Sequence, residues 1–241
     1  QEVVSQIDEC IAALWAVGRD SFLLEMITSC VVYCQEKHQV QQLVCYGVGN
    51  FSKRYSAEML QMSCALLFRY LLETIQLYTG PDMPENCTRD RQEEIHHQNI
   101  ARAFASILRI DFSSKDQQQV SCQRSSIKMM FYDPCTTSLE ERILKEKLNL
   151  EIIQFNEQGK RPVASNHKTI FYMPHCPMRL YSNVVWVNWD KSVLTEGNII
   201  IVGNSLLAYN DRIVDADERM DATNAIVRIA PFVKETHLRL R

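Results

Sequence analysis

Apolar residues recur at helical spacing near the start of the chain. Those between Val3 and Leu14 lie three or four residues apart, and Gly18 follows them, which predicts an amphipathic helix that ends near this glycine. Asp20 is a suitable N-cap for a second helix, whose apolar positions extend from Phe22 to Val31. We therefore expect residues 1–40 to form an N-terminal segment of two helices.

From residue 40 onward, short apolar runs alternate with helical patterns. The run Leu43–Tyr46 is followed at once by Gly47-Val48-Gly49-Asn50, and then by a nearly all-apolar helix from about Tyr55 to Glu73. A strand, a glycine turn and a buried helix are the opening of a doubly wound fold.

The same alternation returns after residue 125. Further strands are expected at residues 127–132, 150–155, 169–173, 198–202 and 225–229. Ser138 and Glu141 have the spacing of a capping box that opens one intervening helix, and Pro177 begins another that extends through Trp186. Short strands separated by helices pair in parallel through right-handed crossovers.

These patterns predict an α/β fold. We expect a Rossmann-like, mostly parallel sheet of about six strands with helices on both faces, preceded by the two N-terminal helices. A single domain is expected to span residues 1–241.

Residues 79–125 interrupt the alternation of strands and helices. They begin with a turn-forming cluster, Thr79–Pro84, and contain a polar run without periodicity, Lys115–Gln119. Between these two stretches, apolar residues from Ile95 to Leu108 predict one more helix. We expect this segment to be an insertion that is partly mobile.

Composition and charge argue against two classes of binding partner, nucleic acids and membranes. The formal net charge is -3, with no block of like charges, whereas nucleic-acid-binding faces are usually strongly basic. No apolar run approaches the roughly 20 residues that span a bilayer. We therefore expect neither a nucleic-acid nor a membrane partner.

The chain starts with no signal peptide and without Met, so we expect it to be trimmed. The nine cysteines include no Cys-x-x-Cys pair, which favours reduced thiols in a cytoplasmic protein, with the nucleus as a second location.

The carboxyl ends of the predicted strands carry most of the candidate chemistry. Open parallel sheets bind ligands at that edge, near the point where the strand order reverses. Polar or glycine residues follow five of the expected strands, and the candidate ligand-binding residues are Gly47, Gly49, Asn50, Asp133, Lys160, Arg161, His175, Cys176, Asn204 and Ser205.

The glycine turn and the acid after the second of these strands each allow two interpretations. Gly47-x-Gly49 resembles a dinucleotide-binding turn, although Ser52 replaces the third glycine and no acidic residue follows at the expected distance. The alternative is a structural turn that needs a positive φ. The Asp133 carboxylate can accept a hydrogen bond from a ribose hydroxyl, or it can form an Asx-type turn ahead of Pro134.

The segment His175-Cys176-Pro177 lies where the fourth of these strands meets a helix. Pro177 suits the first helical position, which places Cys176 at the helix N-terminus, where the dipole lowers a thiol pKa. His175 can act as a base or a metal ligand. Because Cys-Pro is also associated with regulatory heme binding, His175 and Cys176 are candidate ligands of a heme iron. The alternative is an inert, packed thiol.

Two further pairs of residues have a functional and a structural interpretation. Lys160 and Arg161 follow a glycine and suit an anionic group, but basic pairs on loops are commonly just solvated. Trp186 and Trp189 recur at helical spacing, which favours the core over a ligand platform.

Several strand-end segments together resemble the SRR-like family, which is named after Sensitivity to Red Light Reduced. They occur in the same order between Leu43 and Tyr209 and comprise Cys45–Phe51, Tyr132–Pro134, Asn156–Arg161, Phe171–Pro177, Leu180–Asn183 and Ile200–Ser205. The resemblance implies a regulatory role in circadian-clock gene expression, and so in biological rhythms, and in heme-biosynthesis regulation. It brings no catalytic residues, so whether the chain is an enzyme is left open.

The leading hypothesis is a regulatory protein whose strand-end cleft binds a small anionic ligand or heme. The first alternative is a transferase that uses S-adenosylmethionine or a nucleotide, and the second is a non-catalytic scaffold for protein partners. Unidentified protein partners are expected in any of these cases.

Overall fold

A computed structural model describes most of the chain. The described residues are 2–18, 25–26, 39–79, 98, 102, 106, 127–195, 197–215, 217, 219 and 224–237. The predicted second N-terminal helix and the predicted insertion at 79–125 lie outside the described residues, apart from isolated positions and Thr79.

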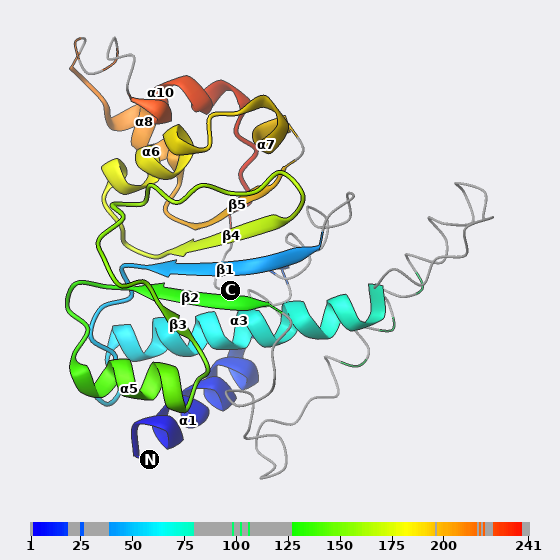
Figure 1. Ribbon diagram of the computed structural model, residues 1–241, viewed down its shortest axis with the longest axis vertical. Helices are drawn as coiled ribbons and strands as arrows, with labels where there is room; N and C mark the ends of the chain where they lie inside the picture. The colour runs from blue at the N-terminus through cyan, green and yellow to red at the C-terminus, as the bar shows by residue number, and fades with distance from the viewer. Residues whose placement is uncertain are drawn as a thin grey trace.

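Five parallel strands form the sheet that the described residues build (Figure 1). They are β1 (Val40–Tyr46), β2 (Lys128–Tyr132), β3 (Glu151–Ile152), β4 (Lys168–Met173) and β5 (Ile199–Gly203). Their order is β3-β2-β1-β4-β5. The chain therefore builds outward from β1 to β3 and then returns to the other side of β1. This order confirms the predicted Rossmann-like arrangement, with the reversal between β1 and β4.

Side chains of the central strand β1 alternate between two hydrophobic clusters. Leu43 and Cys45 belong to one cluster, whereas Val44 and Tyr46 belong to the other, and all four are buried. A parallel strand covered on both faces needs apolar residues at consecutive positions. This requirement explains the uninterrupted apolar run that the sequence has here.

Helices cover both faces of the sheet (Figure 1). One face carries α1 (Glu2–Gly18), α3 (Ala57–Thr79) and α5 (Ser138–Glu146). The other carries α6 (Met178–Val187), α8 (Leu206–Arg212) and α10 (Ala225–Ile229), with α7 (Lys191–Thr195) and the short 3-10 helix η1 (Ala230–Phe232) beside them. The prediction of helices on both faces is confirmed.

The start of α3 is determined by the residues just before it. Tyr55 has a φ of 56°, which is outside the helical region, so the helix begins later than expected. The Ser56 hydroxyl then accepts a hydrogen bond from the Met59 N–H at 3.1 Å and caps the first turn. These two residues bring the N-terminus of α3 to the carboxyl end of β1.

Two local predictions are wrong. Residues 225–229 form helix α10 instead of a sixth strand, because the Asn224 side chain accepts from the Ile226 N–H and caps a helix packed against α6. The capping box of α5 uses Thr137 and Glu140, one residue earlier than the predicted Ser138 and Glu141. Glu140 is fully buried and also accepts from the Ser52 N–H at 2.8 Å, which ties α5 to the loop after β1.

The two tryptophans predicted for the core lie at the surface instead. Trp186 and Trp189 have exposed fractions of 44% and 36%, and the Arg228 guanidinium lies 5.0 Å from the Trp189 ring centroid. The buried stripe of α6 consists of Tyr181, Val184 and Val185. Trp186 falls outside that stripe, and Trp189 follows the end of the helix, so neither side chain reaches the sheet.

The carboxyl group of Asp8 on α1 gives a testable pH dependence. Partial burial raises its pKa from 3.8 to about 6, so the folded state holds its proton more tightly than the unfolded state does. Stability therefore falls as the pH rises from about 4 to about 6, and the penalty persists above that range. We expect Asp8→Asn to raise the free energy of unfolding at pH 7.5 by about 1–2 kcal/mol, after allowance for partial exposure.

Denaturant unfolding at pH 7.5 and at pH 4.0 measures this effect. The gain should shrink at pH 4.0, where the unfolded wild-type chain also holds much of its proton. Glu9→Gln is the control, because it removes an exposed carboxylate from the same helix. The Glu9 carboxylate lies 3.8 Å from the Arg54 guanidinium, and both side chains are more than half exposed. An equal gain at both pH values would contradict the assigned pKa.

Candidate functional site

A pocket of about 600 Å³ opens at the carboxyl ends of β1, β2 and β4. This is the side of the sheet, and the reversal in strand order, where doubly wound folds bind ligands. Its lining residues come from the ends of these strands and the loops after them, from the loop after β3, and from the starts of α3 and α6. They are Tyr46, Gly47, Val48, Gly49, Ala57, Glu58, Gln61, Tyr132, Asp133, Pro134, Cys135, Asn156, Gly159, His175, Cys176, Pro177 and Leu180.

The ten predicted site residues divide evenly. Five line the pocket, namely Gly47, Gly49, Asp133, His175 and Cys176. The other five lie outside its lining, namely Asn50, Lys160, Arg161, Asn204 and Ser205.

Both glycines of the turn after β1 are needed for backbone geometry and for space. Gly47 has a φ of 67° and Gly49 a φ of 84°, values that glycine adopts without strain. A Cβ atom on Gly47 would lie 2.6 Å from the Cys176 Sγ, and one on Gly49 would lie 2.6 Å from the Glu58 Cγ. The turn is therefore closely packed against both α3 and the segment after β4.

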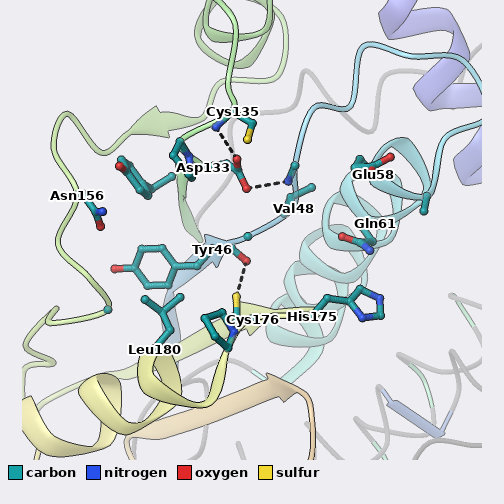
Figure 2. A pocket seen from close by; sticks show the side chains of 17 residues that line it. Tyr46, Val48, Glu58, Gln61, Asp133, Cys135, Asn156, His175, Cys176 and Leu180 are labelled. Carbon is teal, nitrogen blue, oxygen red and sulfur yellow. Dashed lines mark hydrogen bonds between the residues drawn. The ribbon is translucent and has the colours of Figure 1, made fainter.

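Asp133 joins the turn after β2 to the glycine turn. Its Oδ2 accepts a hydrogen bond from the Gly49 N–H at 2.8 Å, and its Oδ1 accepts one from the Cys135 N–H at 2.8 Å (Figure 2). The second bond forms the predicted Asx-type turn. Each carboxylate oxygen keeps one lone pair for a ligand, because a carboxylate can accept about four hydrogen bonds.

The N-terminus of α3 carries a carboxylate of the protein itself. Glu58 lies in the first turn, and its pKa is lowered because the carboxylate accepts hydrogen bonds from its own N–H and from the Ser56 hydroxyl. Glu58 is therefore charged at neutral pH. In dinucleotide-binding folds this helix end faces a phosphate group.

The lining of the pocket has an acidic balance. Glu58 and Asp133 contribute carboxylates, and no Lys or Arg is among the lining residues that the structure describes. Figure 2 shows Glu58, Gln61 and His175 on one side of the view. Tyr46, Asn156 and Leu180 lie on the other side, and Asp133 and Cys176 lie between the two groups.

One residue of the predicted basic pair on the loop after β3 takes part in an internal ion pair. Arg161 donates to both carboxylate oxygens of Glu157, at 2.6 and 3.0 Å. The Tyr46 hydroxyl donates to the same carboxylate at 2.8 Å. Lys160 is exposed. Glu157 was missed as a partner of Arg161, because a spacing of four residues indicates an ion pair only on a helix and these residues lie in a loop.

The residues after β5 have structural partners as well. The Asn204 N–H donates to the Tyr181 hydroxyl at 2.9 Å, and its side-chain amide donates to the Tyr209 hydroxyl at 2.8 Å. Ser205 caps α8 and donates to Glu235 at 2.7 Å. Asn50 similarly accepts from the nearby Ser52 hydroxyl at 2.8 Å.

The predicted activation of the Cys176 thiol is wrong. Pro177 is the N-cap of α6 and Met178 its first residue, so Cys176 precedes the cap. The thiol is 3% exposed and donates to the Tyr46 carbonyl at 3.4 Å. Burial, and to a lesser extent the negative charge of Asp133, raises the pKa of the Cys176 thiol to about 12. Cys176 is therefore a protonated, packed thiol.

His175 is placed differently from its neighbour. Its side chain is exposed and lines the pocket, and its backbone has a φ of 57°. A left-handed conformation is uncommon for a residue other than glycine, and such strain is concentrated at functional sites.

The pocket fits a heme poorly. Cys176 is not available as a thiolate, and the described lining has two carboxylates, Glu58 and Asp133, and no Lys or Arg that could pair with the carboxylates of a heme. No group of three or more His, Cys, Asp or Glu residues suited to a metal ion occurs within the described ranges.

Several lining residues were missed from the sequence. Gln61 and Leu180 look like ordinary helical positions, and Tyr46 looks like the end of a buried strand. Glu58 is the exception, because an acidic residue in the first helical turn after a glycine turn indicates that a carboxylate of the protein lies at the helix N-terminus.

Comparison with known proteins identifies one family. The sequence model described as the SRR1 domain matches residues 103–239, more than half of the chain. An SRR1-like protein from Mus musculus is 36% identical over 93 residues, which cover 39% of this chain and 36% of that protein. Protein SENSITIVITY TO RED LIGHT REDUCED 1 from Arabidopsis thaliana is 33% identical over 96 residues, which cover 40% of this chain and 33% of that protein. The chain thus spans about a third of the length of these relatives. No solved structure matches it significantly.

The contact between Gly47 and Cys176 gives the first prediction for this site. Gly47→Ala should lower the free energy of unfolding by about 2–4 kcal/mol, because a positive φ and the contact with Sγ both oppose a Cβ atom. Cys176→Ala removes the sulfur but not the φ requirement. The double variant should therefore be more stable than the sum of the two single effects by about 1–2 kcal/mol, as measured by denaturant unfolding. Strict additivity would show that the two residues do not contact each other.

Differential thiol labelling gives the second prediction. Cys135 is exposed, whereas Cys176 is buried and its pKa is raised to about 12, and the thiolate is the reactive species. Iodoacetamide at pH 8 should modify Cys135 within minutes and leave Cys176 unmodified until denaturant is added, as read by peptide mass spectrometry. Equal rates in the native protein would contradict the packed position of Cys176.

Proposed function

The chain belongs to the SRR1 domain family, and on this basis we propose that it is a regulatory protein whose pocket at the strand reversal binds a small-molecule ligand. The observation that carries the proposal is the pocket itself. It opens where ligands bind in this class of fold, and turns from three strands are hydrogen-bonded and packed around it. A pocket that is formed before a ligand arrives has little conformational entropy to lose on binding.

The chemistry of the lining favours binding over covalent catalysis. The Cys176 thiol is protonated and donates to a backbone carbonyl, so it is a poor nucleophile. Nucleophilic catalysis needs a side chain activated by an adjacent base, and no hydrogen-bonded pair of this kind occurs among the described lining residues. The transferase alternative requires only bound cofactor and substrate and is tested by the same ligand search.

Family membership supports a coarse physiological role. The Arabidopsis relative is named for sensitivity to red light, which supports a regulatory role for this chain. Participation in clock-gene expression and in heme-biosynthesis regulation stays a prediction, as do cytoplasmic or nuclear location and protein partners. Among the described helices, none has the length and apolar character needed to cross a membrane.

Obstruction of the pocket tests the proposed function. Ala57 is exposed and lines the pocket at the start of α3, whereas Leu60 is 48% exposed on the same helix and outside the lining. After incubation with a metabolite extract, native mass spectrometry should detect a small molecule bound to the wild-type chain. Ala57→Trp should abolish that species and Leu60→Trp should retain it.

Circular dichroism and thermal unfolding confirm that both variants remain folded. Absence of any bound molecule from the wild-type protein, or equal retention by both variants, would overturn the proposed function.

A further inference from the structure

We propose that the pocket selects a ribonucleoside-type ligand, neutral or cationic, and discriminates against its phosphorylated forms. This inference rests on the proposed ligand-binding function and specifies the chemical class of the ligand. It depends on which polar groups of the pocket are already engaged and which remain open.

Two of the N–H groups that bind phosphate in doubly wound folds already have partners within this protein. Dinucleotide phosphates contact the N–H groups of the glycine turn and of the following helix N-terminus. Here the Gly49 N–H donates to Asp133 at 2.8 Å, and the Met59 N–H donates to the Ser56 hydroxyl at 3.1 Å. A phosphate would have to displace these acceptors.

Charge opposes a phosphate at the same place. Glu58 lies against Gly49, since a Cβ atom there would be only 2.6 Å from the Glu58 Cγ, and hydrogen bonds keep its carboxylate ionised. Asp133 adds a second carboxylate to the lining, and no Lys or Arg among the described lining residues offsets them. Like charges a few ångströms apart repel, so an anionic group is disfavoured here.

The open lone pairs of Asp133 fit a ribose. In dinucleotide-binding folds an acidic residue accepts hydrogen bonds from ribose hydroxyls, and Asp133 is an acid at the end of β2 beside the glycine turn. Each of its oxygens accepts one backbone N–H and keeps one free lone pair. A vicinal diol supplies two O–H donors and can bond to both oxygens together.

The rest of the lining suits a heterocyclic base. Pro177 and Leu180 provide apolar surface, and the Asn156 side chain provides amide N–H donors, while its Oδ1 already accepts from the Gln158 N–H at 2.9 Å. Figure 2 places Leu180 and Asn156 on the side of the view opposite Glu58. A base on that side leaves the 5′ position of the ribose to face Glu58, where a neutral or cationic group is tolerated.

Matched pairs of ligands test this inference directly. Isothermal titration calorimetry on the full chain would compare adenosine, guanosine, cytidine and uridine with their 5′-monophosphates, and would include S-adenosylmethionine as a nucleoside with a cationic substituent. At least one nucleoside or S-adenosylmethionine should bind, and a bound nucleoside should bind at least tenfold more tightly than its monophosphate. Asp133→Asn should weaken binding at least tenfold.

Charge reversal at Glu58 gives a variant that keeps both partners of the Gly49–Asp133 hydrogen bond. Glu58→Lys should bring the affinity for the monophosphate to at least that for the nucleoside, because it replaces the repelling carboxylate by a cation. Glu141→Lys makes the same charge change on an exposed position of α5, outside the lining, and should leave the selectivity unchanged. This pair keeps the test decisive even if Asp133→Asn does not fold.

The outcomes separate this inference from the proposed function. Monophosphates that bind as well as nucleosides, or selectivity that Glu58→Lys does not alter, would overturn the ligand class while the pocket remained a binding site. The ligand class also fails if none of these probes binds although native mass spectrometry detects another bound molecule. If neither experiment detects a ligand, the proposed function fails as well.

Discussion

Strand β1 is paired along both edges and covered on both faces, and the other elements are arranged around it. β2 and β4 pair with its two edges in parallel register, while Leu43 and Val44 are fully buried in opposite clusters. The chain passes from β1 to α3 on one face and from β4 to α6 on the other, so the loops after these two neighbouring strands diverge at the carboxyl edge of the sheet. The pocket lies where they separate, so the burial of one strand determines where a ligand can bind.

Internal carboxylates hold the rim of the sheet together. The Gly49 N–H donates to Asp133, the Arg161 guanidinium to Glu157, and the Ser205 hydroxyl to Glu235. Each of these donor groups could bind an external anion, but each instead bonds to a carboxylate of the protein. The carboxylate comes from the same loop for Arg161 and from a distant part of the chain for Gly49 and Ser205. The same bonds that stabilise the strand-end turns therefore remove sites for phosphate, which links the stability of the rim to the proposed ligand preference.

Fold class was predictable from the sequence because it depends on local periodicity. The run Leu43–Tyr46 and the apolar helix after it identified a buried parallel strand and its crossover, and both were confirmed. Residues 225–229 show the limit of this reasoning, since a five-residue apolar run suits a buried strand and a short helix equally well. The Asn224 cap and the packing against α6 decided for a helix.

By itself, the sequence determined the alternation of strands and helices, the burial of β1, and the glycine and acid positions at the strand ends. These follow from local pattern and from the φ values that each residue type allows. Only the tertiary structure decided which strand-end residues meet around the pocket and which bond elsewhere. The state of Cys176 shows the reason: its pKa depends on burial beneath Gly47 and near Asp133, residues distant in sequence that only the assembled sheet brings together.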